Sequence, residues 1–175
     1  MERVKDLVIR KATKDDMGAV AGMIQELADF EKMSNGPQLT VKDLQRDGFE
    51  KEPPAFSCLV AELPSKHRVI GYALYFPTYS TWRGASMMLE DLYVRPTERK
   101  QGVGDKLFEA VAEEAWGAGC SRLDFHVLEW NPARSFYRRK GALDLTAAEG
   151  WCYYRLLPSA ERAPVPAGNE REDSK

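Results

Sequence analysis

The stretch at residues 86–107, S-M-M-L-E-D-L-Y-V-R-P-T-E-R-K-Q-G-V-G-D-K-L, constrains the fold more than any other part of the chain. The apolar run at 87–94 predicts a buried strand. Pro96 ends that strand, because a proline cannot donate to a sheet ladder. A turn with Gly102 and Gly104 follows, and apolar residues then recur at helical spacing. Because N–H groups at a helix start lack partners, this order of elements predicts an anion-binding site.

The rest of the chain alternates short apolar runs with amphipathic segments. This pattern predicts the order β-α-α-β-β-β-α-β-α-β-β, a mixed α/β fold with helices on a largely antiparallel sheet. We expect strands at 7–9, 56–63, 69–76, 87–94, 122–128, near 143 and at 151–157, and helices at 17–30, 41–49, 105–116 and 131–140. One domain at 1–158 would then precede a charged, Pro- and Ala-rich tail at 159–175.

The composition is that of an ordinary globular protein. The chain has 175 residues, of which 43% are hydrophobic and 30% are charged. Its 25 basic and 27 acidic residues give a net charge of −2, so neither a nucleic-acid nor a membrane surface is indicated. The three cysteines lie far apart with no C-x-x-C pair, which indicates reduced thiols. Without an apolar signal segment or membrane span, the expected compartment is the cytoplasm.

The run R-K-Q-G-V-G at 99–104 fits the pattern R-x-x-G-x-G. It resembles the signature of the GCN5-related N-acetyltransferase (GNAT) superfamily, whose loop binds the pyrophosphate of acetyl-CoA. It is neither the dinucleotide pattern G-x-G-x-x-G nor a P-loop, which needs G-K-[ST].

Further motifs narrow the resemblance to one subfamily, the diamine (spermidine/spermine N1-) acetyltransferases together with the thialysine N-ε-acetyltransferases. These motifs are C-L-V-A-E at 58–62, Y-S-T-W at 79–82, L-E-D-L-Y-V at 89–94, E-W-N at 129–131 and E-G-W at 149–151. The similarity spans roughly residues 4–157, and Y-S-T-W looks more like the thialysine branch. The subfamily implies a homodimer.

The resemblance implies how acetyl-CoA, the cosubstrate, is held. Backbone groups of the central strand would pair with the pantetheine arm like an added strand. The cosubstrate contacts would come from Leu92, Tyr93, Val94, Arg99, Lys100, Gln101, Gly102, Val103, Gly104, Asp105, Asn131, Pro132, Ala133 and Arg134. The chain departs from the subfamily at Lys100, often a glycine, and at Asp105, often serine or threonine. Asn131 alone is equally a plain helix N-cap.

Acetyl transfer to an amine needs a base for the ammonium proton and an acid for the leaving thiolate. Tyr137 resembles the family's general acid, and a phenol with an ordinary pKa near ~10 suits that role. Glu90 matches the carboxylate that acts as the base through water. The alternatives are a half-buried helix tyrosine and a carboxylate held by a salt bridge. Between Asn131 and Tyr137 one residue fewer is present than the subfamily usually has.

The resemblance also implies an amine channel lined with acidic and aromatic groups, which suit a long cation. Its positions are Phe30, Glu31, Glu90, Asp91, Asp124, Phe125, His126, Glu149 and Trp151. Each also has a structural reading, such as a helix end or an outward strand position. Glu90 and Asp91 are adjacent on a strand and so point to opposite faces.

The expected activity is acetyl-CoA-dependent N-acetylation of a small polyamine or a lysine-like amine, by direct attack in a ternary complex. No Ser-His-Asp, Cys-His or metal-ligand spacing favours a covalent or metal mechanism. The alternatives are a protein-lysine acetyltransferase and a non-catalytic acyl-CoA-binding module. The sequence leaves the choice between spermidine, spermine and thialysine open.

Overall fold

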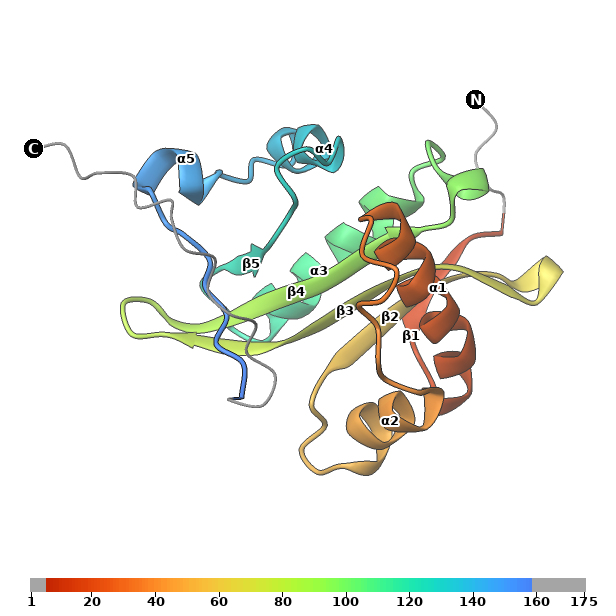
Figure 1. The fold of residues 1–175 in the computed structure, drawn as a ribbon. Coiled ribbons are helices and arrows are strands. Elements are labelled where there is room, and N and C mark those ends of the chain that lie inside the picture. The colour runs from red at the N-terminus through yellow and green to blue at the C-terminus, as the bar shows by residue number, and fades with distance from the viewer. Residues whose placement is uncertain (1–5, 159–175) are drawn as a thin grey trace, which may run out of the picture. The chain divides into compact units, whose positions relative to one another are not determined.

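A computed structural model describes residues 6–158 of the protein. Its first structural feature is a five-stranded sheet (Figure 1). The spatial order follows the chain order: β1 (Val8–Lys11), β2 (Ser57–Leu63), β3 (Arg68–Ser80), β4 (Gly84–Val94) and β5 (Leu123–Phe125). The first four strands pair antiparallel, and β5 joins β4 in parallel. The expected largely antiparallel α/β fold is therefore confirmed.

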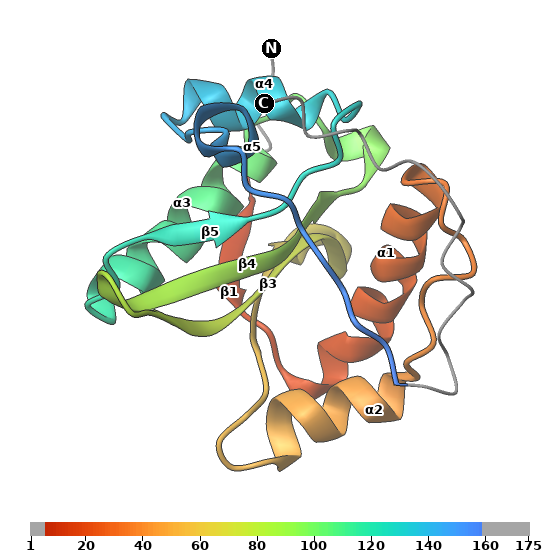
Figure 2. The same ribbon diagram turned by 60° about the vertical axis from the view of Figure 1, so that its left-hand side comes forward.

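Helix α1 (Met17–Phe30) covers one face of the sheet, and α3 (Val103–Gly117) covers the other (Figures 1 and 2). Apolar side chains recur on one side of each helix and are buried there. Helix α2 (Val41–Gln45) adds Leu44 to the α1 face and continues as a π-helical turn at Arg46–Glu50. The core on this face consists of Met17, Val20, Met23, Leu44, Cys58, Val60, Tyr72, Leu74 and Tyr93.

Strand β4 carries one extra residue relative to β3. Leu74 pairs with Asp91 and the next residue, Tyr75, pairs with Leu89, so Glu90 has no partner on β3. This is a β-bulge, in which two residues of one strand oppose one of its neighbour. The bulge lies within the stretch from which the sequence predicted the site.

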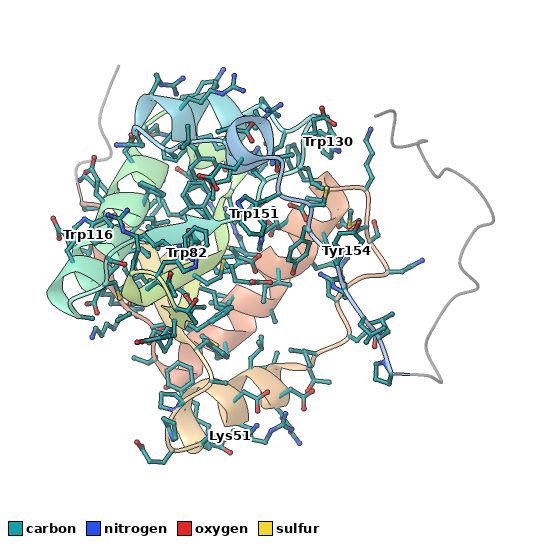
Figure 3. All side chains as sticks on the ribbon, turned by 90° about the vertical axis from the view of Figure 1, so that its left-hand side faces the viewer. Lys51, Trp82, Trp116, Trp130, Trp151 and Tyr154 are labelled. Carbon is teal, nitrogen blue, oxygen red and sulfur yellow. The ribbon has the colours of Figure 1, made fainter. Side chains whose placement is uncertain are left out.

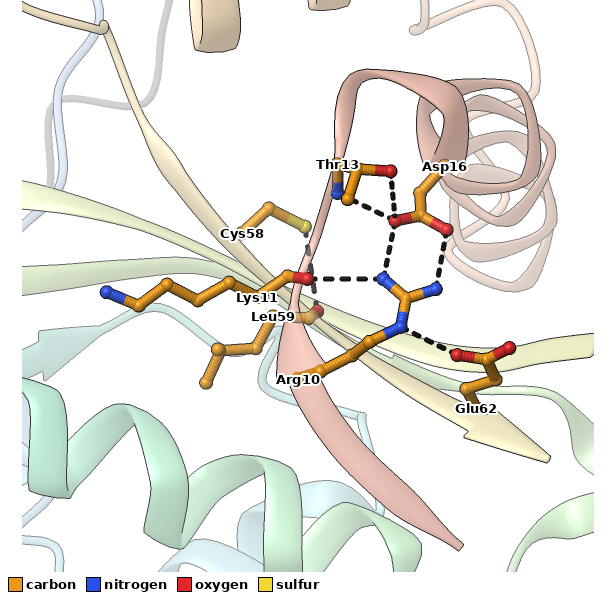
Figure 4. Close-up of polar contacts among 7 residues, drawn as sticks. All are labelled: Arg10, Lys11, Thr13, Asp16, Cys58, Leu59 and Glu62. Carbon is orange, nitrogen blue, oxygen red and sulfur yellow. Dashed lines mark hydrogen bonds and ion pairs between the residues drawn. The ribbon is translucent and has the colours of Figure 1, made fainter. Parts of the chain in front are cut away.

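Arg10 joins the first strand to the start of α1 and to β2 (Figure 4). Its guanidinium donates to both carboxylate oxygens of Asp16 at 2.7 and 2.9 Å, and to Glu62 at 2.6 Å. Asp16 also accepts from the backbone N–H of Thr13 at 2.7 Å, which is one half of a capping box. The Arg10 guanidinium holds the pKa of Asp16 below its usual range. These contacts fix the angle at which the chain enters α1.

The chain divides into two units, Met1–Trp130 and Asn131–Lys175. In the second unit, α4 (Ala133–Arg139) and α5 (Leu145–Glu149) are connected by an ion pair of 2.7 Å between Arg134 and Asp144. Within residues 6–158, no helix is long and apolar enough to cross a membrane. The tail predicted at 159–175 lies outside the described residues, and the single-domain boundary at 158 stays a prediction.

The last two strands of the predicted order are wrong. A helix, α5, follows the position expected for the first of them, because Asp144 caps it by accepting from the backbone N–H of Ala147 at 3.2 Å. The segment 151–158 has no regular secondary structure. The apolar run there satisfied the strand pattern, but a strand also needs a neighbouring edge with which to pair. The strand predicted at 122–128 is shorter than expected and spans only Leu123–Phe125.

Gly71 allows β3, β4 and α3 to approach closely, and this gives a stability prediction. A Cβ at Gly71 would lie 2.8 Å from the Tyr93 carbonyl oxygen and 3.2 Å from Leu107 Cδ1. The Tyr93 carbonyl group belongs to the backbone and cannot rotate away from the added methyl group as a side chain could. Gly71→Ala should therefore lower the free energy of unfolding by about 1–3 kcal/mol in chemical denaturation. Gly22→Ala is the matched control. Nothing lies within 4 Å of its new methyl group, so a gain of about 0.5–1 kcal/mol is expected. Equal stability of the two variants would contradict this account.

Candidate active site

The loop at 99–104 bends sharply and leads directly into α3. Gly102 (φ 82°) and Lys100 (φ 61°) both have left-handed backbones, and the helix begins at Val103. No side chain caps the helix at Gly102. The first-turn N–H groups of an α-helix have no partner within the helix, and the dipole of this 15-residue helix favours an anion at its start. Asp105 lies half-buried in this first turn.

Arg99 ties this loop to the end of β4 and to the end of α1. Its Nε donates to the Val94 carbonyl oxygen at 2.7 Å. Its guanidinium lies over the ring of Tyr93, 5.3 Å from the centroid, and 5.6 Å from the ring centroid of Phe30. Cation–π contacts of this kind hold a planar cation between two rings. The first residue of the R-x-x-G-x-G pattern therefore contacts Phe30, a residue predicted for the amine channel.

Glu26, which the sequence did not single out, belongs to the same network. It accepts a hydrogen bond from the Tyr93 hydroxyl at 3.0 Å and pairs with Arg95 at 3.4 Å. In the sequence, Glu26 has the position of any charged residue on the polar side of an amphipathic helix. No neighbouring residue indicates that Tyr93 and Arg95 are its partners. Glu26 links α1 to the strand that precedes the glycine loop.

Beyond the bulge, β4 has an edge that β5 does not cover. The parallel pairing joins Met87–Leu89 to Leu123–Phe125 and extends no further within the described residues. The backbone of Leu92, Tyr93 and Val94 pairs with β3 on its other side. A strand edge of this kind can accept an extended chain by backbone hydrogen bonds.

The two adjacent carboxylates at the bulge differ in exposure. Glu90 is exposed, whereas Asp91 is half-buried and accepts a hydrogen bond from the Tyr72 hydroxyl at 2.9 Å. Burial raises the pKa of Asp91 to about 6, and the Tyr72 hydrogen bond opposes that rise, while the charges of Glu90 and Glu31 reinforce it. Burial also raises the pKa of Glu31. Three of the predicted amine-channel carboxylates therefore lie within electrostatic reach of one another.

Aromatic rings surround the end of α1. The rings of Phe30 and Trp130 lie 5.6 Å apart, and Lys32 Nζ lies 5.2 Å from the Trp130 ring centroid. The other predicted channel residues of this unit are engaged elsewhere. Asp124 pairs with Arg122 at 2.7 Å, and Phe125 packs edge-on against Phe108 at 5.8 Å, so the structural reading explains both. His126 is exposed.

In the second unit, Asn131 accepts from the backbone N–H of Ala133 at 2.9 Å, as an N-terminal cap of α4 does. Pro132 precedes Ala133 and Arg134 in the first turn, and the Arg134 guanidinium is bound to Asp144. Tyr137 lies one turn later, half-buried, with its ring 5.1 Å from that of Phe136. Trp151 donates from its indole to Glu149 at 2.6 Å. The catalytic and cosubstrate roles of these residues stay predictions.

Comparison with known proteins agrees with this geometry. The profile of the Acetyltransferase (GNAT) family matches residues 21–142. The thialysine N-epsilon-acetyltransferase of Bos taurus is 44% identical over 163 residues, which cover 89% of this chain and 95% of that protein. The spermidine/spermine N(1)-acetyltransferase-like protein 1 of Homo sapiens is 37% identical over 154 residues, covering 85% of this chain and 22% of that protein.

Among solved structures, an integron cassette protein from the mobile metagenome of V. cholerae has the same fold, with a TM-score of 0.69 and 24% identity, covering 88% of this chain and 94% of that one. The family match extends over the central strand, the glycine loop and α4. The chain belongs to the GNAT acetyltransferase family and is an acyltransferase.

Proposed function

We propose that this acyltransferase moves the acetyl group of acetyl-CoA to the primary amine of a small lysine-like molecule such as thialysine. The observation that supports this most directly is a pair of desolvated carboxylates, Glu31 and Asp91. Both lie in the unit that holds the glycine loop, and two carboxylates near one another favour the binding of a cation. The relatives of 44% identity are named for thialysine, and the relative named for spermidine/spermine is 37% identical. Polyamines are the alternative class.

The glycine loop and the free edge of β4 fit the cosubstrate. The N–H groups of Gly102, Val103 and Gly104 would hold its pyrophosphate, with Lys100 adding a positive charge. The backbone from Leu92 to Val94 would pair with its pantetheine arm. When bound, acetyl-CoA supplies an activated acetyl group as a thioester.

On the amine side, we assign cation binding to Asp91 and Glu31, with the ring of Phe30 beside them. Because the bulge interrupts the alternation of the strand at Glu90, we assign this exposed carboxylate the role of the base, which accepts the ammonium proton through an intervening water molecule. Tyr137 donates its hydroxyl proton to the departing sulfur. An acyl-enzyme on Cys58 is disfavoured, because burial raises the pKa of this thiol to about 12 and keeps it protonated.

Tyr137→Phe tests the general acid. Loss of the hydroxyl should lower kcat for amine acetylation about 100-fold or more and leave the Kd for acetyl-CoA within about threefold. Steady-state kinetics and calorimetry measure the two quantities. Tyr154→Phe is the matched control in the same unit, since Tyr154 is 88% exposed, and it should behave as the wild type. A Tyr137→Phe enzyme with wild-type kcat would rule out this role.

A panel of amines tests the substrate. We expect kcat/KM for thialysine to exceed that for spermidine by about tenfold or more, a difference of ~1.4 kcal/mol in transition-state stabilisation. Lysine, spermine and a lysine-containing peptide complete the panel. A preference for spermidine would move the enzyme to the polyamine class, and a preference for the peptide would make it a protein-lysine acetyltransferase. Binding of acetyl-CoA without turnover of any amine would contradict the proposal as a whole.

We also propose a cytoplasmic homodimer. Apolar side chains at 153–157 are exposed, among them Tyr154 at 88% and Leu156 at 80% (Figure 3), which is unusual for a monomer. Sedimentation velocity at about 20 μM should therefore give the mass of two chains. A single species of one-chain mass would overturn the dimer, and recovery of a tagged protein in a membrane fraction would overturn the location.

A further inference from the structure

Tyr72, which is not among the predicted site residues, forms a hydrogen bond with Asp91, which is one of them. The Tyr72 side chain has no exposed surface, and its hydroxyl donates to Asp91 Oδ2 at 2.9 Å. Tyr72 pairs across the sheet with Tyr93, two residues beyond Asp91, and the two tyrosine rings lie 6.4 Å apart. Both tyrosines belong to the core beneath α1. A buried hydroxyl needs a hydrogen-bond partner, and here that partner is a carboxylate of the candidate site.

We propose that Tyr72 is a positioning residue for amine acetylation: its buried hydroxyl fixes the Asp91 carboxylate and keeps it in the ionised form that a cationic amine requires. This inference rests on the proposed function, since it assumes that Asp91 faces the amine. It adds a residue of β3 to a site otherwise built from β4, α1 and the glycine loop.

The groups facing Asp91 show why a donor is needed. Glu90 on its own strand and Glu31 at the end of α1 are acidic, and their charges favour the protonated form of Asp91. Cys58 on β2 stays a neutral thiol. Glu26, also on α1, is engaged by Tyr93 and Arg95. The Tyr72 hydroxyl is the interaction that lowers the pKa of Asp91 against its burial.

The ionised and protonated forms of Asp91 interconvert close to neutral pH. With a pKa of about 6, Asp91 is ionised by about ten to one at pH 7. A hydrogen bond to a charged group is among the stronger ones in proteins, so its loss should raise this pKa by about one unit or more. At pH 7 about half of the molecules would then carry a neutral Asp91, which attracts an amine cation poorly.

Tyr72→Phe tests the proposal with little change of shape. The ratio of kcat/KM between variant and wild type, taken at each pH, cancels the titration of the amine itself. We expect this ratio to be constant above about pH 8.5, to fall between about pH 8 and pH 5, and to level at about one tenth of its alkaline value. Tyr75→Phe removes another buried hydroxyl from the same strand without touching Asp91, so its ratio should not vary with pH.

Carbon-13 NMR of labelled aspartate carboxyl groups gives a readout without turnover. The Asp91 resonance, assigned by its loss in Asp91→Asn, should titrate near pH 6 in the wild type and about one unit higher in Tyr72→Phe. In the Asp91→Asn background, adding Tyr72→Phe should have no pH-dependent effect on kcat/KM. If Tyr72→Phe does not fold, the proposal stays falsifiable: a wild-type Asp91 that titrates above pH 7, or an Asp91→Asn enzyme with wild-type kcat/KM, overturns it.

The outcomes separate the two proposals. A wild type that acetylates amines, with the same Asp91 titration in Tyr72→Phe, overturns the role of Tyr72. A pH-dependent effect of Tyr72→Phe that persists without Asp91 overturns it as well. Failure of the wild type to acetylate any amine overturns the proposed function instead, whatever the carboxylate titration shows.

Discussion

The extra residue in β4 determines most of what the site can do. Because Glu90 has no partner on β3, the strand changes its alternation there, and Asp91 turns toward the core under α1 while Glu90 meets solvent. The pairing with β5 ends at Leu89, immediately before the bulge. Next to the inserted residue, β4 therefore has an exposed carboxylate, a half-buried carboxylate and, within the described residues, a strand edge that β5 does not cover.

The network around Arg99 connects this strand to the rest of the N-terminal unit. Arg99 binds the Val94 carbonyl and stacks on Phe30 and Tyr93, and Tyr93 in turn donates to Glu26. The loop that we propose for the phosphate and the helix end that we propose for the amine cation are therefore linked through shared side chains. A rearrangement at one of them changes the packing at the other, since Phe30 cannot move without leaving the Arg99 guanidinium.

Sequence patterns predicted the parts of this protein that local rules govern. Both long helices followed from apolar spacing along the chain. Strand alternation predicted different surroundings for Glu90 and Asp91. It could not predict which of the two is the less exposed, because that depends on a register shift against β3.

The features that the sequence did not predict have two causes. Some depend on residues distant in the chain, and one had a local signal that a neighbouring apolar residue contradicted. Tyr72 and Glu26 belong to the site through neighbours 19 and 67 residues away, and no pattern along the chain marks such pairs. The strand expected at 151–157 had suitable residues but no edge beside it in the structure. The capping aspartate at 144 was a local signal, and it was overlooked because the apolar residue before it suggested a strand.

Lys100 occupies a left-handed backbone conformation that costs a non-glycine residue roughly 1–2 kcal/mol. That cost is met in the folded chain, before any ligand arrives. A loop already bent in this way has little conformational freedom left to lose on association, so the entropic penalty of binding a phosphate there is small. A lysine at this bend lowers the stability of the protein slightly, and it gives the loop a fixed bend together with a positive charge.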